Sequence, residues 1–225
     1  MNDGSNSDVV KSGARTNGII LGLIATALLG FAAMSKSWLA HPQMGISFGP
    51  LGCRNCNSCF ATRATVFDRD SPDRTEEISS ARCIYASEGM SNGAFVEQLR
   101  DSHNVLGEDV TSDAFAPLGW VTFVGLIIAT LALATSAGLA LANKRPQLRI
   151  SPASLATIGV MVSLIAGCIF VGTKPGGPGF VAMSHGFWAF GIGSVVGIAA
   201  AQMLSKVIRP LDPDLMADAM NPDQF

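Results

Sequence analysis

The chain has 225 residues, a formal net charge of −2 and 14% charged residues against 48% apolar ones. That is poorer in charge than an average soluble domain, and the charges are unevenly placed along the chain. These two features exclude an ordinary soluble domain and direct attention to membrane-spanning segments.

Four stretches carry no Asp, Glu, Lys or Arg, and each is at least 20 residues long: 16–35, 114–143, 150–173 and 175–205. A helix needs about 20 apolar residues to cross a hydrocarbon core of roughly 30 Å. The sequence predicts an all-α membrane protein: a four-transmembrane-helix bundle with a large disulfide-stapled extracytoplasmic loop between helices 1 and 2. The expected division is a tail 1–15, a span 16–36, a loop 37–116, a span 117–142, a turn 143–152, a span 153–173, a turn 174–179, a span 180–205 and a tail 206–225.

The first predicted span follows a polar tail that contains Lys11 and Arg15. Basic residues ahead of an apolar run are also typical of a cleaved signal peptide, which is the alternative for this segment. The apolar run over 19–34 is long for the hydrophobic region of a signal peptide, so a retained helix is expected.

The loop after the first span holds four of the five cysteines, at Cys53, Cys56, Cys59 and Cys83. Two disulfides are the expected chemistry in an oxidising compartment, with one bond inside 53–59 and the other reaching Cys83. The longer bond would close about 25–31 residues and stabilise the loop by roughly 3–4 kcal/mol. Two alternatives remain open: an iron–sulfur cluster or zinc ion on the same thiolates, and a redox-active C-x-x-C pair.

The rest of the loop carries signals for two short helices. Ser71 is a good N-cap, Pro72 suits the first helical position, and Gly89 would follow the end of the first helix. A second helix is expected over about 94–102. Trp38, just after the first span, is expected in the headgroup belt of the membrane. The loop 37–116 is therefore predicted to fold as a small unit, called the cap below.

Small residues recur at four-residue spacing in every predicted span, and such stripes let helix backbones approach closely in lipid. The stripes are Gly18, Gly22, Thr26 and Gly30; Thr130, Ala134, Gly138 and Ala142; Gly159, Ser163 and Gly167; and Gly193, Gly197 and Ala201. One interpretation is internal packing of a single bundle. The other is that a stripe, with Gly193, Gly197 and Ala201 as the candidate, faces a partner subunit.

Ionisable residues inside a membrane normally mark ion pathways, and the absence of Asp, Glu, Lys and Arg from the spans argues against a transporter or proton pump. His185 is expected to be a hydrogen-bonded residue near the outer end of the fourth span, with metal or haem ligation as the alternative. Cys168 is expected to be a small packed residue of the third span. The sequence predicts no catalytic residue, no metal and no cofactor, the iron–sulfur alternative apart.

Lys and Arg residues near the span ends gather on one side, within 11–15, 144–149 and 206–209. Such residues remain cytoplasmic, so both termini are expected in the cytoplasm and the cap in the periplasm or extracellular space. The expected location is the plasma (inner) membrane. The loop is acidic overall, which argues against nucleic acid as a partner.

The C-terminal tail predicts a short helix, with Asp212 as N-cap and Pro213 at the first helical position. Its apolar face is expected either to fold back onto the membrane surface or to dock on a neighbouring subunit. The residues that would dock are Leu211, Leu215, Met216 and Met220.

Two sequence features resemble those of a known family. They are Trp38 after the first span and the run Gly49, Pro50, Leu51, Gly52 and Cys53. With the order of one span, a large outer loop and three closely spaced spans, the chain resembles the claudin and peripheral-myelin-protein superfamily of four-span proteins. The resemblance implies this topology with cytoplasmic ends, and no sealing function is inferred from it.

Two functions are compatible with these features. The first is a non-enzymatic integral membrane protein, an accessory or structural subunit of a membrane protein assembly, whose outer cap contacts other membrane protein subunits. The alternative is an electron-transfer or thiol-redox membrane protein that uses the loop cysteines, through an iron–sulfur cluster or disulfide exchange.

Overall fold

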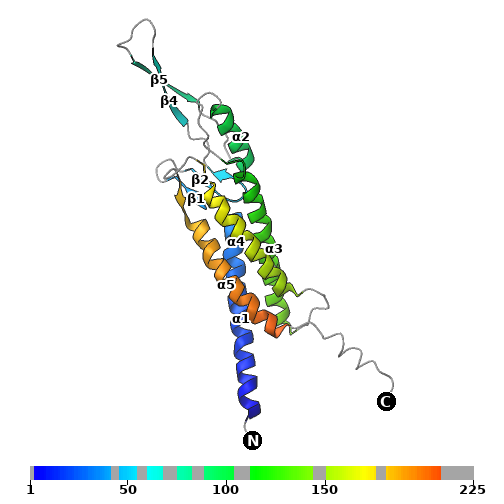
Figure 1. Cartoon of the computed structure of the whole chain (residues 1–225). Coiled ribbons are helices and arrows are strands. Elements are labelled where there is room, and N and C mark those ends of the chain that lie inside the picture. The colour runs from blue at the N-terminus through cyan, green and yellow to red at the C-terminus, as the bar shows by residue number, and fades with distance from the viewer. Residues whose placement is uncertain are drawn as a thin grey trace, which may run out of the picture.

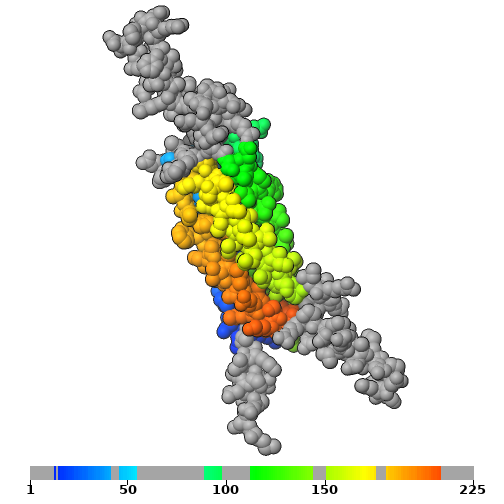
Figure 2. All heavy atoms as spheres, in the orientation of Figure 1, coloured from blue at the N-terminus to red at the C-terminus, as the bar shows by residue number. Residues whose placement is uncertain are grey.

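The computed structural model of the chain describes residues 3–41, 46–54, 60–67, 75–82, 89–103, 112–143, 151–175 and 181–208. Long helices run side by side along an elongated bundle, and strands with one shorter helix lie at the end far from the N-terminus (Figure 1). The space-filling view shows the coloured parts of the helices packed against one another (Figure 2).

Within the described residues, four helices are long and apolar enough to cross a membrane. They are α1 (Asp3–Met34), whose spanning part is Arg15–Met34, α3 (Phe115–Leu141), α4 (Pro152–Gly172) and α5 (His185–Val207). The prediction of a four-span membrane protein is confirmed at this level. The bundle exposes large apolar side chains such as Leu23, Ile128, Ile158 and Val195. A lipid bilayer covers such a surface without the penalty that water would impose.

The bundle is held together by small residues that let backbones approach. Helix α3 crosses α4 at Gly125 and Gly159, and a Cβ added at Gly159 would lie 2.9 Å from the backbone nitrogen of Ala129. Helix α1 packs against both α3 and α5. Gly18 and Gly22 of α1 lie against the side chain of Leu204 in α5. Close backbone packing of this kind replaces the hydrophobic drive that is missing between helices in lipid.

A four-stranded antiparallel sheet lies across the end of the bundle far from the N-terminus, in the order β3-β2-β1-β6. Strands β1 (Leu39–Ala40), β2 (Ser47–Phe48) and β3 (Cys53–Arg54) follow α1 directly. Strand β6 (Ala182–Met183) comes from the segment before α5, where Ala40 pairs with Ala182 and Leu39 with Met183. Because 182–183 join this sheet, α5 begins at His185, later than the start at residue 180 that the sequence predicts.

The rest of the cap is helix α2 (Asn92–His103) and a hairpin of β4 (Phe60–Phe67) and β5 (Thr75–Arg82). The helix expected over 94–102 is confirmed within α2. The helix expected after Ser71 is wrong, because Thr75–Arg82 is a strand that pairs with β4 over eight residue pairs. Capping signals depend only on residues within one helical turn. This strand instead pairs with β4, whose Thr and Val residues favour extended backbone.

Candidate functional site

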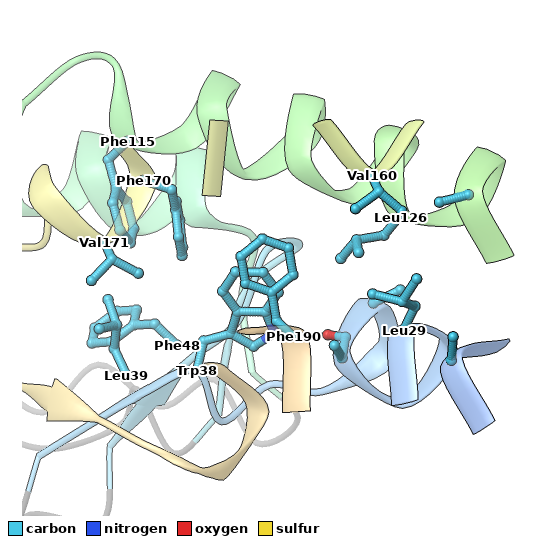
Figure 3. Close-up of a cluster of buried hydrophobic side chains, with 14 of the residues drawn as sticks. Leu29, Trp38, Leu39, Phe48, Phe115, Leu126, Val160, Phe170, Val171 and Phe190 are labelled. Carbon is cyan, nitrogen blue, oxygen red and sulfur yellow. Dashed lines mark hydrogen bonds between the residues drawn. The ribbon is translucent and has the colours of Figure 1, made fainter. Parts of the chain in front are cut away.

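The candidate site is the junction between the cap and the bundle, and Trp38 lies at its centre. Its side chain is fully buried, and its indole Nε1 donates to the carbonyl oxygen of Ala32 at 2.7 Å. The ring stacks on Phe190 of α5 with 4.6 Å between centroids and meets Phe170 of α4 edge-on at 6.1 Å (Figure 3). The prediction of a headgroup-belt position for Trp38 is therefore wrong. The neighbouring strand β1 pairs with β6 and directs the indole into the bundle end.

Further aromatic rings extend this contact into the cap. Phe48 of β2 lies edge-on to Phe95 of α2, with centroids 4.9 Å apart, and to Phe115 of α3, at 6.0 Å. Phe115 in turn stacks on Phe170 with 4.5 Å between centroids. Together with Trp38 and Phe190, these rings form one buried layer, called the aromatic layer below, to which β2 and four helices contribute (Figure 3). The layer fixes the base of the cap to the adjoining end of the bundle.

Backbone hydrogen bonds join the same two parts on the side of α5. The amide of Ser184 donates to the carbonyl of Trp38 at 2.8 Å, and the amide of Gly186 donates to that of Ser37 at 2.9 Å. A Cβ at Gly186 would lie 2.7 Å from both Ser35 Oγ and Trp38 Cδ1. Glycine is therefore required where α5 starts beneath the turn that follows α1.

Asn92 connects the N-terminus of α2 to the turn between β2 and β3. Its buried Nδ2 donates to the carbonyl oxygens of Gly49 and Pro50, each at 2.9 Å. The Pro50 carbonyl lies so close to Gly119 of α3 that a Cβ there would come within 2.2 Å of it. Asn92 thus holds a turn that is also packed directly on the bundle. Its Oδ1 is buried and has no hydrogen-bond partner within the described part of the chain.

Cys53 is the cysteine of the cap that the structure describes. It is fully buried, its amide donates to the Met90 carbonyl at 2.9 Å, and its sulfur is disulfide-bonded. Gly89, with φ of 89°, packs against the Cys53 carbonyl, which a Cβ would approach to 2.2 Å. The other three cysteines of the predicted set lie outside the described residues: Cys56, Cys59 and Cys83. The pairing and the second bond stay predictions, and no cluster of three metal-ligating side chains occurs among the described residues.

Cys168 differs from its prediction as a packed core residue. It is a free thiol on the exposed surface of α4. The buried face of α4 contains Gly159, Ser163 and Gly167, and successive residues of a helix point about 100° apart. Residue 168 therefore faces outward, beside large apolar side chains.

The stripe predicted to face a partner lies inside the bundle. A Cβ at Gly193 would lie 3.0 Å from Leu28 Cβ, and one at Gly197 would lie 3.4 Å from Leu133 Cδ1. Ala201 is buried as well. These three residues pack inside the bundle, as the internal-packing interpretation expects.

The stripe predicted on α3 is only partly packed: Thr130 lies against Gly30 of α1, where a Cβ would come 3.6 Å from its Cγ2. Ala134 and Gly138 are exposed, and a Cβ at Gly138 would have no atom within 4 Å. Small residues occur on several sides of this helix, so their spacing alone does not identify the packed side. The small residues that α3 buries are Gly119, Thr122, Gly125, Ala129, Ala132, Ser136, Ala137 and Ala140.

His185 is the first residue of α5, at the end of the bundle that adjoins the cap, and is exposed. Its Nδ1 lies 3.2 Å from Ser184 Oγ, and its ring centroid lies 6.1 Å from that of Phe31. This is the hydrogen-bonded position that the sequence predicts. The tail residues proposed for docking lie outside the described residues: Leu211, Leu215, Met216 and Met220.

Sequence reasoning missed Asn92, the phenylalanines of the aromatic layer and a contact of Arg15. The guanidinium of Arg15 donates to the Ala140 carbonyl at 2.7 Å through Nη2 and at 3.0 Å through Nε. Arg15 was expected only as a cytoplasmic topology signal, yet it also satisfies the C-terminal carbonyls of α3. Arg15 stands at the start of an apolar run, and nothing in the neighbouring sequence indicates a contact with Ala140, 125 residues away.

A scan against protein-family models finds no match, and no curated protein matches the chain.

Proposed function

We propose that this protein is a non-enzymatic subunit of a membrane protein assembly, in which a four-helix bundle without charges in its membrane interior presents a cap for contact with other proteins. The observation that carries the proposal is the junction itself. The aromatic layer, the β1–β6 pairing and Asn92 fix the base of the cap to the bundle, while the β4–β5 hairpin extends beyond it (Figure 1). A site for protein contact is held best on packed and hydrogen-bonded elements, and the junction provides such support.

The interior of the bundle supports a structural role. Its described core consists of apolar side chains with a few buried hydroxyls, at Thr122, Ser136, Ser163 and Ser194. The first three donate to carbonyls of their own helices. The four spans carry a charge only at their ends, at Arg15 and Lys206, and have no Asp, Glu, Lys or Arg between these ends that could bind or relay an ion.

We also propose a plasma (inner) membrane location, with both termini cytoplasmic and the cap outside. The support is the grouping of Lys and Arg at the ends opposite the cap. Arg15 lies at that end, where it binds the last carbonyls of α3. The proposed topology is also that of the claudin and peripheral-myelin-protein superfamily, which the chain resembles. Only the topology is taken from this resemblance.

The proposed cap is tied by two disulfides, one within 53–59 and one that reaches Cys83. Support comes from the buried, disulfide-bonded state of Cys53 and from the oxidising compartment that the topology implies. The iron–sulfur and thiol-redox alternatives use the same four cysteines: Cys53, Cys56, Cys59 and Cys83. A brown protein with bound iron would favour the cluster, and quinone-dependent thiol oxidation would favour redox thiols.

The decisive experiment is purification in a mild detergent, with identification of the proteins that co-elute. A variant lacking residues 61–81, joined by a short Gly-Ser linker, removes most of the hairpin and leaves every cysteine in place. We expect the co-eluting protein to be lost from this variant, while a control with Val195→Ala on the exposed face of α5 retains it. Retention of the same protein by the deletion variant, or a wild-type protein that elutes alone, would refute the proposal.

A further inference from the structure

We propose that Trp120 of α3 and Trp188 of α5 lie in the headgroup layer of a lipid bilayer, so that the hydrocarbon core begins at these two side chains and ends at Arg15 and Lys206. This goes beyond the proposed function, because it assigns a defined band of the surface to lipid headgroups and fixes the depth of the protein in the membrane. It holds for either side of the membrane on which the cap lies.

Both indole rings are exposed at the end of the bundle that adjoins the cap. Trp120 is 57% exposed in the second turn of α3, and Trp188 is 61% exposed in the first turn of α5. Tryptophan is enriched where hydrocarbon meets water, because its apolar ring favours lipid chains while its N–H needs a hydrogen-bond partner that hydrocarbon lacks. An exposed tryptophan on a membrane helix therefore favours the headgroup layer.

The two tryptophans belong to one band around the bundle. Helices α3 and α5 each pack against α1 and α4, which places α3 and α5 diagonally across the bundle. The aromatic layer connects the starts of these two helices, because it contains Phe115 at the start of α3 and Phe190 in the second turn of α5. The exposed indoles therefore lie at similar depths on opposite sides of the bundle, as contact with one headgroup layer requires.

The surface changes character at this band. Toward the middle of the bundle the exposed side chains are apolar, such as Leu131 of α3 and Val195 of α5. On the side of the cap, the charged residues nearest to the spans are Lys36, Asp113 and Lys174, and each lies outside the four spanning helices. A boundary at the tryptophans keeps all three charges out of the hydrocarbon, where they would be costly.

The opposite boundary carries two cations. Arg15 donates to the carbonyl of Ala140 in the last turn of α3. A Cβ on Gly18, one turn further along α1, would lie 3.2 Å from the Cβ of Met203 in α5. Because α1 and α5 run in opposite directions (Figure 1), Arg15 lies near the level of Lys206. Long cationic side chains at this level can reach lipid phosphates while their stems stay in the hydrocarbon.

The distance between the two boundaries matches a bilayer. At about 1.5 Å per residue, the rise is about 32 Å from Trp120 to Leu141 in α3 and about 27 Å from Trp188 to Lys206 in α5. The hydrocarbon core of a typical bilayer is about 30 Å thick. Both helices therefore cross the core between the proposed boundaries.

The excess length of α3 lies beneath the cap. The helix has 27 residues, or about 40 Å, and is longer than the core. With the boundary at Trp120, the excess is the segment from Phe115 to Gly119. Phe115 contacts Phe48 of the cap, and Gly119 packs against the carbonyl of Pro50. The base of the cap thus rests on the part of α3 that extends beyond the hydrocarbon.

The test measures tryptophan fluorescence of the full-length protein in phosphatidylcholine vesicles. Bromine quenches indole fluorescence on contact, so lipids brominated near the headgroup end of their chains are compared with lipids brominated near the chain ends. The sequence has three tryptophans. Trp120→Phe and Trp188→Phe each leave one exposed indole, and the double variant leaves only the buried Trp38, whose signal is subtracted.

We expect the shallow bromine to quench each exposed indole roughly twofold more than the deep bromine does, because the headgroup layer lies nearer to the shallow position. The wild-type protein, which needs no substitution, should show the same preference. The double variant should be quenched little by either lipid, because Trp38 is buried inside the protein.

The matched control is Leu131→Trp in the double variant. Leu131 is 64% exposed and lies about three turns from Trp120 on the same face of α3, about 16 Å deeper and near the middle of the proposed core. Its replacement should be quenched more by the deep bromine. Stronger quenching of Trp120 or Trp188 by the deep bromine, or no quenching of either by the lipids, would overturn the proposal. None of these results depends on whether another protein co-elutes from detergent, so the proposed subunit role is judged separately.

Discussion

The indole ring of Trp38 stacks on the phenyl ring of Phe190, with 4.6 Å between the centroids and 26° between the planes. Trp38 follows the first membrane helix and Phe190 lies in the last, so this contact joins the first and the last membrane helix of the chain. The same indole donates to Ala32 and touches Phe170 and Phe187 edge-on. One side chain thus holds the turn after α1, the end of α4 and the start of α5.

Replacing Trp38 with alanine should strongly destabilise the folded protein. The change removes a fully buried ring and leaves a cavity, for which we expect a loss of about 3–5 kcal/mol in the free energy of unfolding. Thermal unfolding of the detergent-solubilised protein would measure it. The control is Trp188→Ala, since Trp188 is 61% exposed and its loss should cost much less. Equal effects of the two substitutions would contradict the buried position of Trp38.

Gly159→Leu should disrupt the crossing of α3 and α4. A side chain at this position meets backbone atoms of Ala129 and Gly125 at 2.9–3.0 Å, and backbone cannot move aside as a flexible side chain can. Overpacking of this kind typically costs about 1–3 kcal/mol, or more where backbone is displaced. Gly138→Leu is the matched change on α3, where no atom lies within 4 Å. Its melting temperature should remain near that of the wild type.

Asn92→Ala should loosen the cap and leave the bundle intact. The substitution removes both hydrogen bonds to the carbonyls of Gly49 and Pro50, which are then left unpaired at a cost of about 1–3 kcal/mol. Hydrogen exchange followed by mass spectrometry should show faster exchange in 46–54 and 89–97. The middle of α3 and α4 should exchange as before. Faster exchange throughout the bundle would mean that Asn92 supports more than the cap.

Arg15→Met should weaken the C-terminal end of α3. The variant keeps a long apolar stem but loses the charged hydrogen bonds to the carbonyl of Ala140, which lies in the last turn of the helix. Cations near a helix C-terminus typically contribute about 0.3–1 kcal/mol, and hydrogen bonds to a charged group contribute more. Exchange of amides in 138–143 should rise. Arg15→Lys should recover part of the protection, because the ammonium restores the charge but not the two-pronged contact.

The cysteines should separate into two chemical classes. Cys168 is exposed on the bundle surface and should react with an apolar maleimide in detergent without prior reduction. Cys53 should react only after reduction and unfolding, because it is buried and disulfide-bonded. Peptide mapping of the non-reduced protein would identify the labelled residue and the proposed partners in the cap. Labelling of several cap cysteines without reductant would exclude the proposed pair of disulfides.

The prediction for the cap shows where local signals end. Ser71 and Pro72 suggest a helix, and only the pairing of Thr75–Arg82 with Phe60–Phe67 reveals the strand. A capping signal depends on a few neighbours in the chain, whereas a strand gains its backbone hydrogen bonds from a segment elsewhere. The same limit applies to β6, two residues that pair with β1 from more than 140 positions away.

The sequence by itself determined the four membrane spans, because span length and the absence of charge are properties of continuous segments that a bilayer selects without reference to neighbours. Only the tertiary structure decided which side of each helix is packed. Small residues lie on both sides of α3, and Trp38 and Cys168 each face opposite to expectation. The reason is physical: inside a membrane the packed and lipid-exposed faces are equally apolar, so hydropathy cannot distinguish them and close backbone approach does.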